Sequence, residues 1–191
     1  MLLGALMLLG AIGLLLYNEN EQQRAAAASA EAIPKVVEAI HARAETQDTA
    51  EVLAVAEQQR TMPVADIDGY GYIGFLGLPA IGLELPVMTD WSYPQLQIAP
   101  CRYTGSTYTD DLVIMAHNYE KHFGKLSKLL QGDQVTFTDM DGNTIVYEVV
   151  VKDILDPTAV EEMTAGDYDL TLFTCTYGGE SRVTVRCDRA E

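Results

Sequence analysis

The sequence predicts a mainly β domain, built as a barrel or a sandwich with short helices, behind an N-terminal membrane helix and a helical spacer. Residues 1–17 carry no charge, residues 18–60 are rich in Ala, Glu and Gln, and the chain beyond Met62 and Pro63 breaks into short apolar runs punctuated by Gly and Pro. Many short strands favour a barrel or a sandwich. We therefore divide the 191 residues into an anchor at 1–17, a spacer at 18–62 and one globular domain at 63–191.

The apolar N-terminal run, MLLGALMLLGAIGLLLY, is predicted to be an uncleaved membrane anchor. At helical rise it reaches about 25 Å, near the lower limit for crossing a bilayer. A cleaved signal peptide is the rival interpretation, but the small residues Ala28, Ser29 and Ala30 lie too far beyond the apolar run to form its cleavage site. No Lys or Arg precedes the run, so the positive-inside rule gives little help with orientation, and export of the domain is an inference.

Residues 18–60 are predicted to form helices that space or brace the domain. Pro34 interrupts them and fits the first turn of a second helix. Asp48 with Glu51 three residues later resembles a capping box before a further helix. Apolar residues recur at helical spacing after the proline, at Val36, Val37, Ile40 and Ala44.

Short apolar runs in the globular domain are predicted to be strands. A short helix is predicted at residues 121–130 and a helical turn at 159–163. The predicted strands cover residues 70–76, 81–87, 112–117, 134–138, 144–152, 170–176 and 182–187.

Charge and cysteine content limit the function classes. The formal net charge of −16 argues against a nucleic-acid partner, because phosphate binding needs clustered Lys and Arg. Three cysteines are an odd number, so an exported protein keeps at least one unpaired thiol, and Cys175 is our candidate. Cys101 and Cys187 then either form a disulfide or sit as small buried apolar groups.

Two motifs that resemble ligand sites fail on their context. Gly69, Gly71 and Gly74 match G-x-G-x-x-G, but no strand precedes them and no helix follows, so we expect strand glycines at a bend or a close backbone approach. The sequence DMDGN at 139–143 lacks the spacing and the final Glu of an EF-hand, and we expect a hairpin turn there, with a loose calcium site as the weaker alternative.

The remaining histidines give no metal motif. We expect His41 to be solvated and His122 to lie on a short exposed helix. Zinc needs three or four converging ligands, and the chain has no C-x-x-C or H-x-x-x-H spacing. The sequence therefore predicts neither a metal nor a cofactor.

The strongest candidate site combines a cysteine, an arginine and a histidine. Cys175 ends a strand and shares a face with Thr171 and Phe173, while Arg182 on the returning strand faces away from the core. His117 ends the apolar run LVIMAHNY. A thiolate attacks, an imidazole protonates a leaving amine, and a guanidinium holds substrate and oxyanion, which together make acyl transfer.

These residues carry a resemblance to the sortase family. TLFTC ending at Cys175, RVTVRC after it, AHNY upstream and GYIGFLGLPAIGLELPV at the start of the domain are similar to sortases over residues 70–187. The resemblance implies an eight-stranded β-barrel and a single-pass membrane cysteine transpeptidase whose catalytic domain lies on the outer face of a Gram-positive type cell.

The same resemblance implies a role for each site residue. Cys175 would attack the Thr-Gly carbonyl of an LPXTG-like sorting signal and hold the protein as a thioester. His117 would serve as acid and then base, and Arg182 would position the signal and the oxyanion, with Arg186 as the second candidate. Asn118 is expected either to orient the imidazole or to cap a turn. The acceptor would be an amine of a cell-wall precursor or a pilin lysine.

The sequence allows more than one class of sortase, and it also allows a protein that binds peptide without catalysis. The turn between Cys175 and Arg182 is short, residues 153–169 are expected to form a wall of the signal groove, and no DPW or DPF lid precedes the domain. The missing lid favours a cell-wall anchoring role over pilin polymerisation. The alternatives are a thiol hydrolase, a membrane-tethered peptide-binding barrel without turnover, and a structural surface protein.

Overall fold

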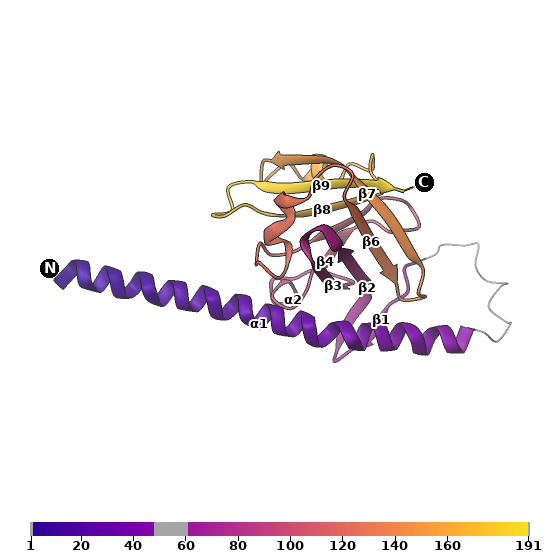
Figure 1. The fold of residues 1–191 in the computed structure, drawn as a ribbon, viewed down its shortest axis with the longest axis horizontal. Helices are drawn as coiled ribbons and strands as arrows, with labels where there is room; N and C mark the ends of the chain where they lie inside the picture. The colour runs from indigo at the N-terminus through magenta and orange to yellow at the C-terminus, as the bar shows by residue number, and fades with distance from the viewer. Residues whose placement is uncertain (1, 48–60, 191) are drawn as a thin grey trace.

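The computed structural model describes residues 2–47 and 61–190. A long helix, α1 (Leu2–Gln47), is followed by strands joined by short helical turns. Figure 1 shows the strands gathered into one body, with α1 passing along its side and its N-terminal half projecting beyond it. The later elements are β1 (Ala65–Ile67), β2 (Tyr70–Leu78), η1 (Pro79–Ile81), β3 (Leu83–Met88), α2 (Tyr93–Leu96), β4 (Cys101–Thr104), β5 (Leu112–Met115), η2 (Phe123–Lys128), β6 (Gln134–Asp139), β7 (Thr144–Leu155), α3 (Val160–Thr164), β8 (Leu170–Cys175) and β9 (Arg182–Arg189).

The strands form a closed barrel. They lie in the order β1-β2-β3-β4-β5-β8-β9-β7-β6, and β2 also pairs with β6. That last pairing joins the two ends of the sheet, so the eight strands β2 to β9 close on themselves and leave β1 as an extra strand on the first part of β2. Closure removes the exposed edges of an open sheet. The predicted eight-stranded barrel is confirmed.

The predicted strands are all present, with ends that differ by up to three residues. β1 and β4 were not predicted, because they have 3 and 4 residues and are too short to show a pattern of alternation. Most neighbouring strands are antiparallel, but β3 pairs with β4 and β5 pairs with β8 in parallel. The β5–β8 pairing matters most for function, because it brings the end of β5 beside the end of β8.

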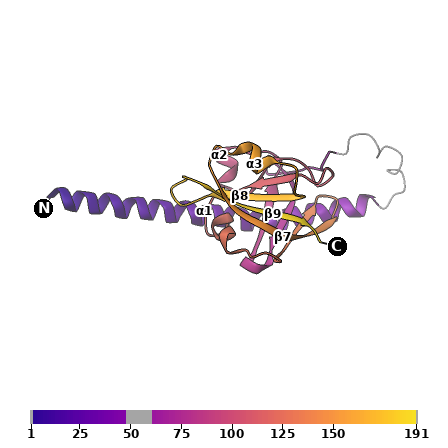
Figure 2. The ribbon, with the colours of Figure 1, turned by 90° about the horizontal axis from the view of Figure 1, so that it is seen from above.

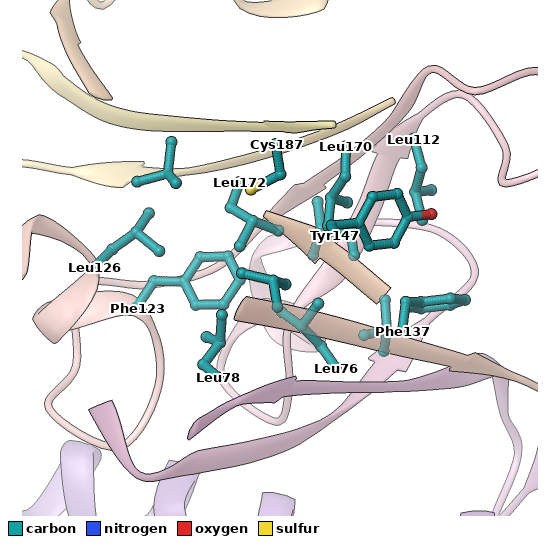
Figure 3. Close-up of a cluster of buried hydrophobic side chains, with 14 of the residues drawn as sticks. Leu76, Leu78, Leu112, Phe123, Leu126, Phe137, Tyr147, Leu170, Leu172 and Cys187 are labelled. Atoms are coloured by element: carbon teal, nitrogen blue, oxygen red, sulfur yellow. The ribbon is translucent and has the colours of Figure 1, made fainter. Parts of the chain in front are cut away.

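The barrel interior is the main hydrophobic core. Large side chains from several strands and from η2 fill it, as Figure 3 shows for Phe123, Phe137, Tyr147 and Leu172. All four are fully buried. Burying such side chains contributes roughly 1.5–3 kcal/mol each relative to exposure, so the interior holds the strands in register.

The prediction of separate spacer helices was wrong, because α1 is a single helix. It runs unbroken from Leu2 to Gln47 with Pro34 inside it, where the sequence predicted separate helices divided at the proline. A proline removes one backbone hydrogen bond, but a stripe of buried residues on both sides of it packs on the barrel and keeps the helix continuous. The predicted capping box at Asp48 and Glu51 lies outside the described residues. The buried stripe consists of Ala25, Ser29, Ala32, Val36 and Ile40.

This stripe covers a second apolar cluster on the outside of the barrel. Ala32, Val36 and Ile40 pack against buried residues that include Tyr72 and Met88 of β2 and β3. Ion pairs flank the contact, with Lys35 Nζ at 2.6 Å from Asp68 Oδ2 and Arg43 Nε at 2.5 Å from Asp141 Oδ1. The views in Figures 1 and 2 both show α1 lying across the barrel. The helix therefore braces the domain.

The N-terminal part of α1 has no such cover. The large apolar side chains from Leu3 to Tyr17 are exposed, and the helix is long and apolar enough to cross a membrane. This agrees with the predicted anchor in length and composition, and crossing of a membrane stays a prediction.

The glycine motif at 69–74 fits its prediction only in part, because β1 precedes it and Gly69 lies in the β1–β2 turn, whereas Gly74 lies within β2. Gly74 has φ of +144° at a register shift of β2, and a Cβ there would lie 2.0 Å from the Thr138 carbonyl oxygen, so the backbones of β2 and β6 approach too closely for a side chain. The sequence DMDGN forms the β6–β7 turn, in which Asp139 Oδ1 accepts from the Asp141 and Asn143 backbone N–H groups, both at 2.9 Å. The hairpin prediction is confirmed.

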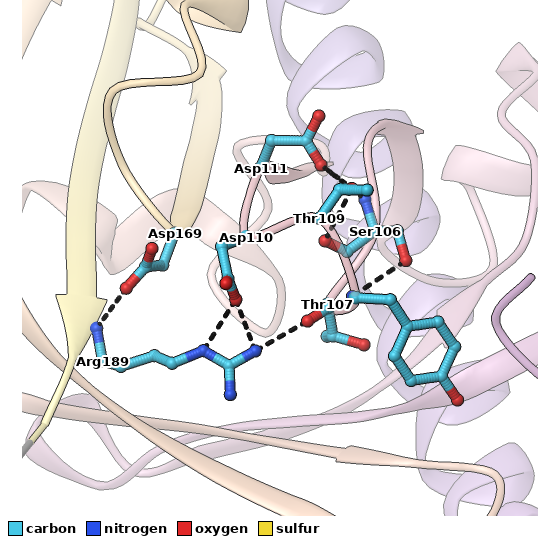
Figure 4. A network of polar contacts seen from close by, with 8 residues as sticks. Ser106, Thr107, Thr109, Asp110, Asp111, Asp169 and Arg189 are labelled. Carbon is cyan, nitrogen blue, oxygen red and sulfur yellow. Dashed lines mark hydrogen bonds and ion pairs between the residues drawn. The ribbon is translucent and has the colours of Figure 1, made fainter. Parts of the chain in front are cut away.

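The polar network in Figure 4 lies at the ends of β8 and β9 that are away from Cys175. Arg189, the last residue of β9, donates to Asp110 Oδ1 at 2.7 Å and to the Thr107 carbonyl at 2.6 Å, while its backbone N–H donates to Asp169 Oδ2 at 2.7 Å. These contacts tie the β4–β5 connection to β8 and β9. They leave the other end of the barrel free for the candidate site.

Candidate active site

Cys175 is the last residue of β8, at the point where the strand enters the turn 176–181. The five residues before it in β8 are buried, whereas Cys175 is half-buried. Leu170 and Leu172 point into the barrel core, and Phe173 belongs to a cluster outside it. Because side chains alternate along a strand, the Cys175 thiol lies on the outer face with Phe173. The predicted position of the thiol at a strand end is confirmed.

Arg182 opens β9 and is the direct cross-strand partner of Cys175. Opposite residues of an antiparallel pair share a face, with Cβ atoms about 4.5–5.5 Å apart. The turn between them is closed by Thr176 N donating to the Ser181 carbonyl at 2.9 Å. Arg182 Nη1 donates to the carbonyls of Gly179 at 3.0 Å and Ser181 at 3.1 Å, which fixes the guanidinium beside this turn.

His117 lies next to this pair, because β5 and β8 are parallel neighbours. The ladder between β5 and β8 ends two residues before His117 on β5 and two residues before Cys175 on β8. The same register, continued past the end of β5, brings His117 level with Cys175. The contact continues past the end of β5, since Thr174 Oγ1 donates to the Ala116 carbonyl at 2.8 Å. Paired strands lie about 4.8 Å apart. His117 therefore follows β5 at the same end of the barrel as Cys175 and Arg182.

The His117 imidazole is half-buried and lies against Tyr119, with ring centroids 4.8 Å apart. Burial lowers its pKa below the usual 6.5, so the neutral ring is favoured at neutral pH. No hydrogen bond joins the side chains of His117 and Cys175, both of which the structure describes. The favoured form of the ring is therefore the neutral imidazole, without a hydrogen bond to the thiol.

Residues 116–124, which we call the His117 loop, curl back on themselves. Phe123 N donates to the His117 carbonyl at 3.1 Å, and His122 N donates to the Tyr119 carbonyl at 2.9 Å. Asn118 Nδ2 donates to the Thr176 carbonyl at 3.4 Å. Asn118 therefore links the His117 loop to the turn that follows Cys175, instead of holding the imidazole.

His122 contradicts its prediction. It was expected on an exposed helix, but its side chain is 0% exposed and its Nε2 lies 3.0 Å from Ser29 Oγ of α1. Burial lowers its pKa to about 4. The local sequence suggested exposure because the surface that covers His122 comes from a helix 93 residues earlier in the chain.

Two adjoining hollows surround the site. The Cys175 pocket, of about 310 Å³, lies at the barrel end between η2 and the β8–β9 turn, and the α1 groove, of about 880 Å³, lies between α1 and the His117 loop. Asn118, Gly124 and Tyr177 line both hollows, whereas His117 and Arg182 line neither. A bound chain therefore has room beside the thiol.

Comparison with known proteins identifies the family. The sequence model of the sortase domain matches residues 76–190, which is more than half of the chain. The chain belongs to the sortase family. No curated protein gives a significant match to the sequence.

Solved sortases share this fold. Sortase C1 from Streptococcus suis is 29% identical over 63% of this chain and 73% of its own, with a TM-score of 0.54. Sortase C from Streptococcus pneumoniae is 23% identical over 84% and 97%, with a TM-score of 0.63. A sortase C from Clostridium perfringens, solved with the C-terminal cell wall sorting motif, is 22% identical over 84% and 90%, with a TM-score of 0.57.

The other two cysteines differ from Cys175. Cys101 and Cys187 are buried and unpaired, so the disulfide alternative does not occur, and burial raises the pKa of each thiol to about 12. A thiol with such a pKa holds its proton at neutral pH and is a poor nucleophile. Within residues 2–47 and 61–190, no three His, Cys, Asp or Glu side chains gather as a metal site would require.

Arg186 is occupied elsewhere in this sortase domain. It is 5% exposed, its Nε lies 3.2 Å from Asp153 Oδ2, and its Nη2 donates to the Glu162 carbonyl at 2.7 Å. Its guanidinium also lies 4.9 Å from the centre of the Tyr168 ring. These contacts hold α3 against the outer face of β8 and β9, so Arg186 supports the wall beside the site.

Sequence reasoning missed the contribution of α1 to this region. Tyr17, Glu21 and Gln22 line the α1 groove, and Ser29 reaches His122. A signal was present: small and apolar residues recur at Ala25, Ser29, Ala32 and Val36, a spacing that marks one helix face. That pattern predicts a packed face but not which loop it meets.

Proposed function

We propose that this sortase is a membrane-anchored cysteine transpeptidase that cleaves an LPXTG-like sorting signal through a thioester on Cys175 and passes the protein to an amine of a cell-wall precursor. One observation supports the proposal: Arg182 is the cross-strand partner of Cys175, and His117 follows β5, the strand that runs parallel beside β8. A thiol, an imidazole and a guanidinium in one place are the groups that acyl transfer needs.

The first half-reaction cleaves the signal. The neutral His117 imidazole takes the Cys175 proton as the sulfur attacks the carbonyl carbon of the scissile Thr-Gly bond, forming a tetrahedral oxyanion. As the oxyanion collapses, the C–N bond breaks and the imidazolium returns its proton to the leaving amine. The acyl group remains on Cys175 as a thioester.

The second half-reaction transfers the protein. An incoming amine attacks the thioester carbonyl, its proton passes to His117, and the C–S bond breaks. The sulfur then recovers the proton, so the enzyme returns to its starting state. If water replaces the amine, the same steps give hydrolysis.

Arg182 stabilises the negative charge of both tetrahedral intermediates. Its Nη1 is held by the turn carbonyls, and neither its Nε nor its Nη2 donates to another described residue. A fixed donor beside the reacting carbon costs little reorganisation during the reaction. We assign the substrate-facing role to these two nitrogens.

The N-terminal apolar part of α1 anchors the enzyme, and the catalytic domain lies outside the cell. The exposed apolar side chains of this part have the length and composition of a membrane span. A pilin lysine is the second candidate acceptor, because the solved structures that share this fold include a sortase C from Streptococcus pneumoniae whose structure gives insight into pilin substrate specificity.

Product analysis tests the reaction. We would incubate the full chain in detergent micelles with an LPXTG peptide, with and without an amine, and separate the products by mass spectrometry. We expect a peptide–amine conjugate when amine is present, and no product from Cys175→Ala. Only hydrolysed peptide at saturating amine would favour the thiol hydrolase, and peptide binding without any product would favour the peptide-binding barrel.

A further inference from the structure

We propose that Ser29 and Gln22 of α1 are positioning residues that hold the His117 loop, so that α1 is part of the catalytic apparatus as well as a brace. This inference rests on the proposed role of His117. It deepens that proposal by assigning function to a helix outside the barrel.

The first contact is a buried hydrogen bond between distant segments. Ser29 is 3% exposed, His122 is 0% exposed, and Ser29 Oγ lies 3.0 Å from His122 Nε2. The hydroxyl donates its one proton to the Ile98 carbonyl at 2.7 Å. With the hydroxyl donating to Ile98, Ser29 Oγ accepts from His122, and we assign the ring proton to Nε2.

The second contact holds the middle of the same loop. Gln22 Oε1 accepts from the Glu120 backbone N–H at 3.3 Å. Gln22 and Ser29 lie seven residues apart, two turns of one helix face. Both ends of the short stretch from Glu120 to His122 are thus fixed to α1.

The held stretch connects directly to the proposed base. The Tyr119 ring contacts both histidines, with its centroid 4.8 Å from that of His117 and 5.7 Å from that of His122. Phe123, next to His122, donates its backbone N–H to the His117 carbonyl at 3.1 Å. A shift of His122 therefore moves the backbone and the ring packing of His117.

The Cys175 side of the site meets the same assembly. Asn118 links the loop to the turn after Cys175, and residues of α1 line the groove that adjoins the Cys175 pocket. A displacement of a reacting group by about 1 Å lowers the reaction rate on the order of a hundredfold. Fixing the loop therefore bears on turnover rather than on peptide affinity.

Nuclear magnetic resonance of the full chain in micelles gives a direct readout. The chain has only three histidines, so ring-labelled protein gives three assignable signals. We expect the His122 signal to report the Nε2–H tautomer, and Ser29→Ala to shift the signals of both His122 and His117. Val36→Ala is the matched control, because Val36 is a buried residue of the same helix face that packs away from the loop.

Kinetics give the second readout. Ser29→Ala should lower kcat by roughly tenfold with little change in KM, and Val36→Ala should lower stability alone. His122→Gln keeps an N–H donor toward Ser29 and should retain more activity than His122→Phe. If Ser29→Ala does not fold, Gln22→Ala, at a partly exposed position, tests the other contact.

The outcomes separate this inference from the proposed function. Unchanged His117 signals and unchanged kcat in Ser29→Ala, or effects equal to those of Val36→Ala, would overturn the positioning role. A wild-type protein that makes no thioester would overturn the proposed function, while a His117 shift in Ser29→Ala would still show that α1 holds the loop.

Discussion

The three cysteines of this sortase carry the same thiol in different surroundings. Cys101 and Cys187 are buried, with pKa values raised to about 12, while Cys175 is half-buried at a strand end. Reactivity toward an alkylating agent needs both a thiolate and access. The environment therefore leaves Cys175 as the most accessible of the three thiols.

We expect iodoacetamide to modify Cys175 of the folded protein at least ten times faster than Cys101 or Cys187, because burial withholds the thiolate of the other two. Peptide mapping by mass spectrometry measures the three rates. Unfolding in denaturant is the control, and it should make the rates similar. Slow labelling of Cys175 in the folded chain would support the peptide-binding barrel instead.

The lowered pKa of the His117 imidazole should be visible in the pH dependence of the reaction. The pKa of this ring is lowered by burial, so the neutral base persists as pH falls below 6.5, and the acid limb of kcat/KM should have its midpoint below pH 6.5. Tyr119→Ala uncovers the ring, so the limb should move upward toward pH 6.5. Tyr177→Ala, which removes a tyrosine that is 96% exposed, should leave the limb in place. An acid limb at the same pH in Tyr119→Ala would show that burial by Tyr119 does not set the pKa.

Single residues also show where sequence reasoning ends. The thiol, the arginine and the histidine could be proposed as a site from the sequence, because strand alternation and residue chemistry are local. His122 was misjudged because its cover comes from α1, and Arg186 was considered for the site because its partners on β7 and α3 are not visible in its own strand.

Among the structural elements, β5 and β8 matter most. Their sequences predicted two strands, but not that these strands are parallel neighbours, because alternation reveals the faces of a strand and not its partner. The grouping of His117 with Cys175 therefore came from residue chemistry and from the resemblance to sortases, and not from strand spacing. The Cys175–Arg182 pair was predictable, since two strands joined by a short turn form a hairpin.

Closure of the barrel depends on β2 and β6, and Gly74 tests it. Gly74→Ala places a Cβ 2.0 Å from the Thr138 carbonyl oxygen at a φ of +144°, and we expect a loss of about 3 kcal/mol or more in the free energy of unfolding. Gly69→Ala is the matched control, with φ of +83° and no atom within 4 Å, and should cost only about 1 kcal/mol. Denaturant unfolding followed by the single tryptophan measures both. Equal losses would mean that the β2–β6 approach is not tight.

At the scale of the whole molecule, α1 and the barrel form one unit. The sequence predicted an apolar anchor and a helical spacer with a break at Pro34. The helix is continuous instead, because its packing on the barrel outweighs the backbone hydrogen bond that Pro34 cannot make. A separate spacer would let the domain move freely relative to the anchor. The continuous, docked helix instead predicts a fixed orientation of the site relative to the anchor.

The buried His122 links this docking to pH. Its pKa is about 4 in the folded protein and near 6.5 when unfolded, so the unfolded chain binds the proton first as pH falls. Stability is therefore full above pH 6.5 and falls toward pH 4, with a slope approaching about 1.4 kcal/mol per pH unit. Around His122 lie His117 and Tyr119 from its own loop, the Ser29 hydroxyl, and the carbonyls of Ala25 and Ile98.

Comparison of the wild type with His122→Phe isolates this effect, because carboxylates titrate alike in both. Denaturant unfolding at pH 7 and pH 5 should show a smaller loss of stability in the variant. An equal loss in both proteins would show that His122 does not remain neutral in the folded state.

The proposed reaction depends on a thioester between Cys175 and a sorting signal. The most direct measurement incubates the full chain with an LPXTG peptide, quenches the reaction in acid, and maps the adduct by mass spectrometry. We expect an acyl group on Cys175 that hydroxylamine removes, and none on Cys175→Ala. An adduct on another residue, or no adduct from a broad peptide panel while Cys175 still alkylates readily, would contradict it.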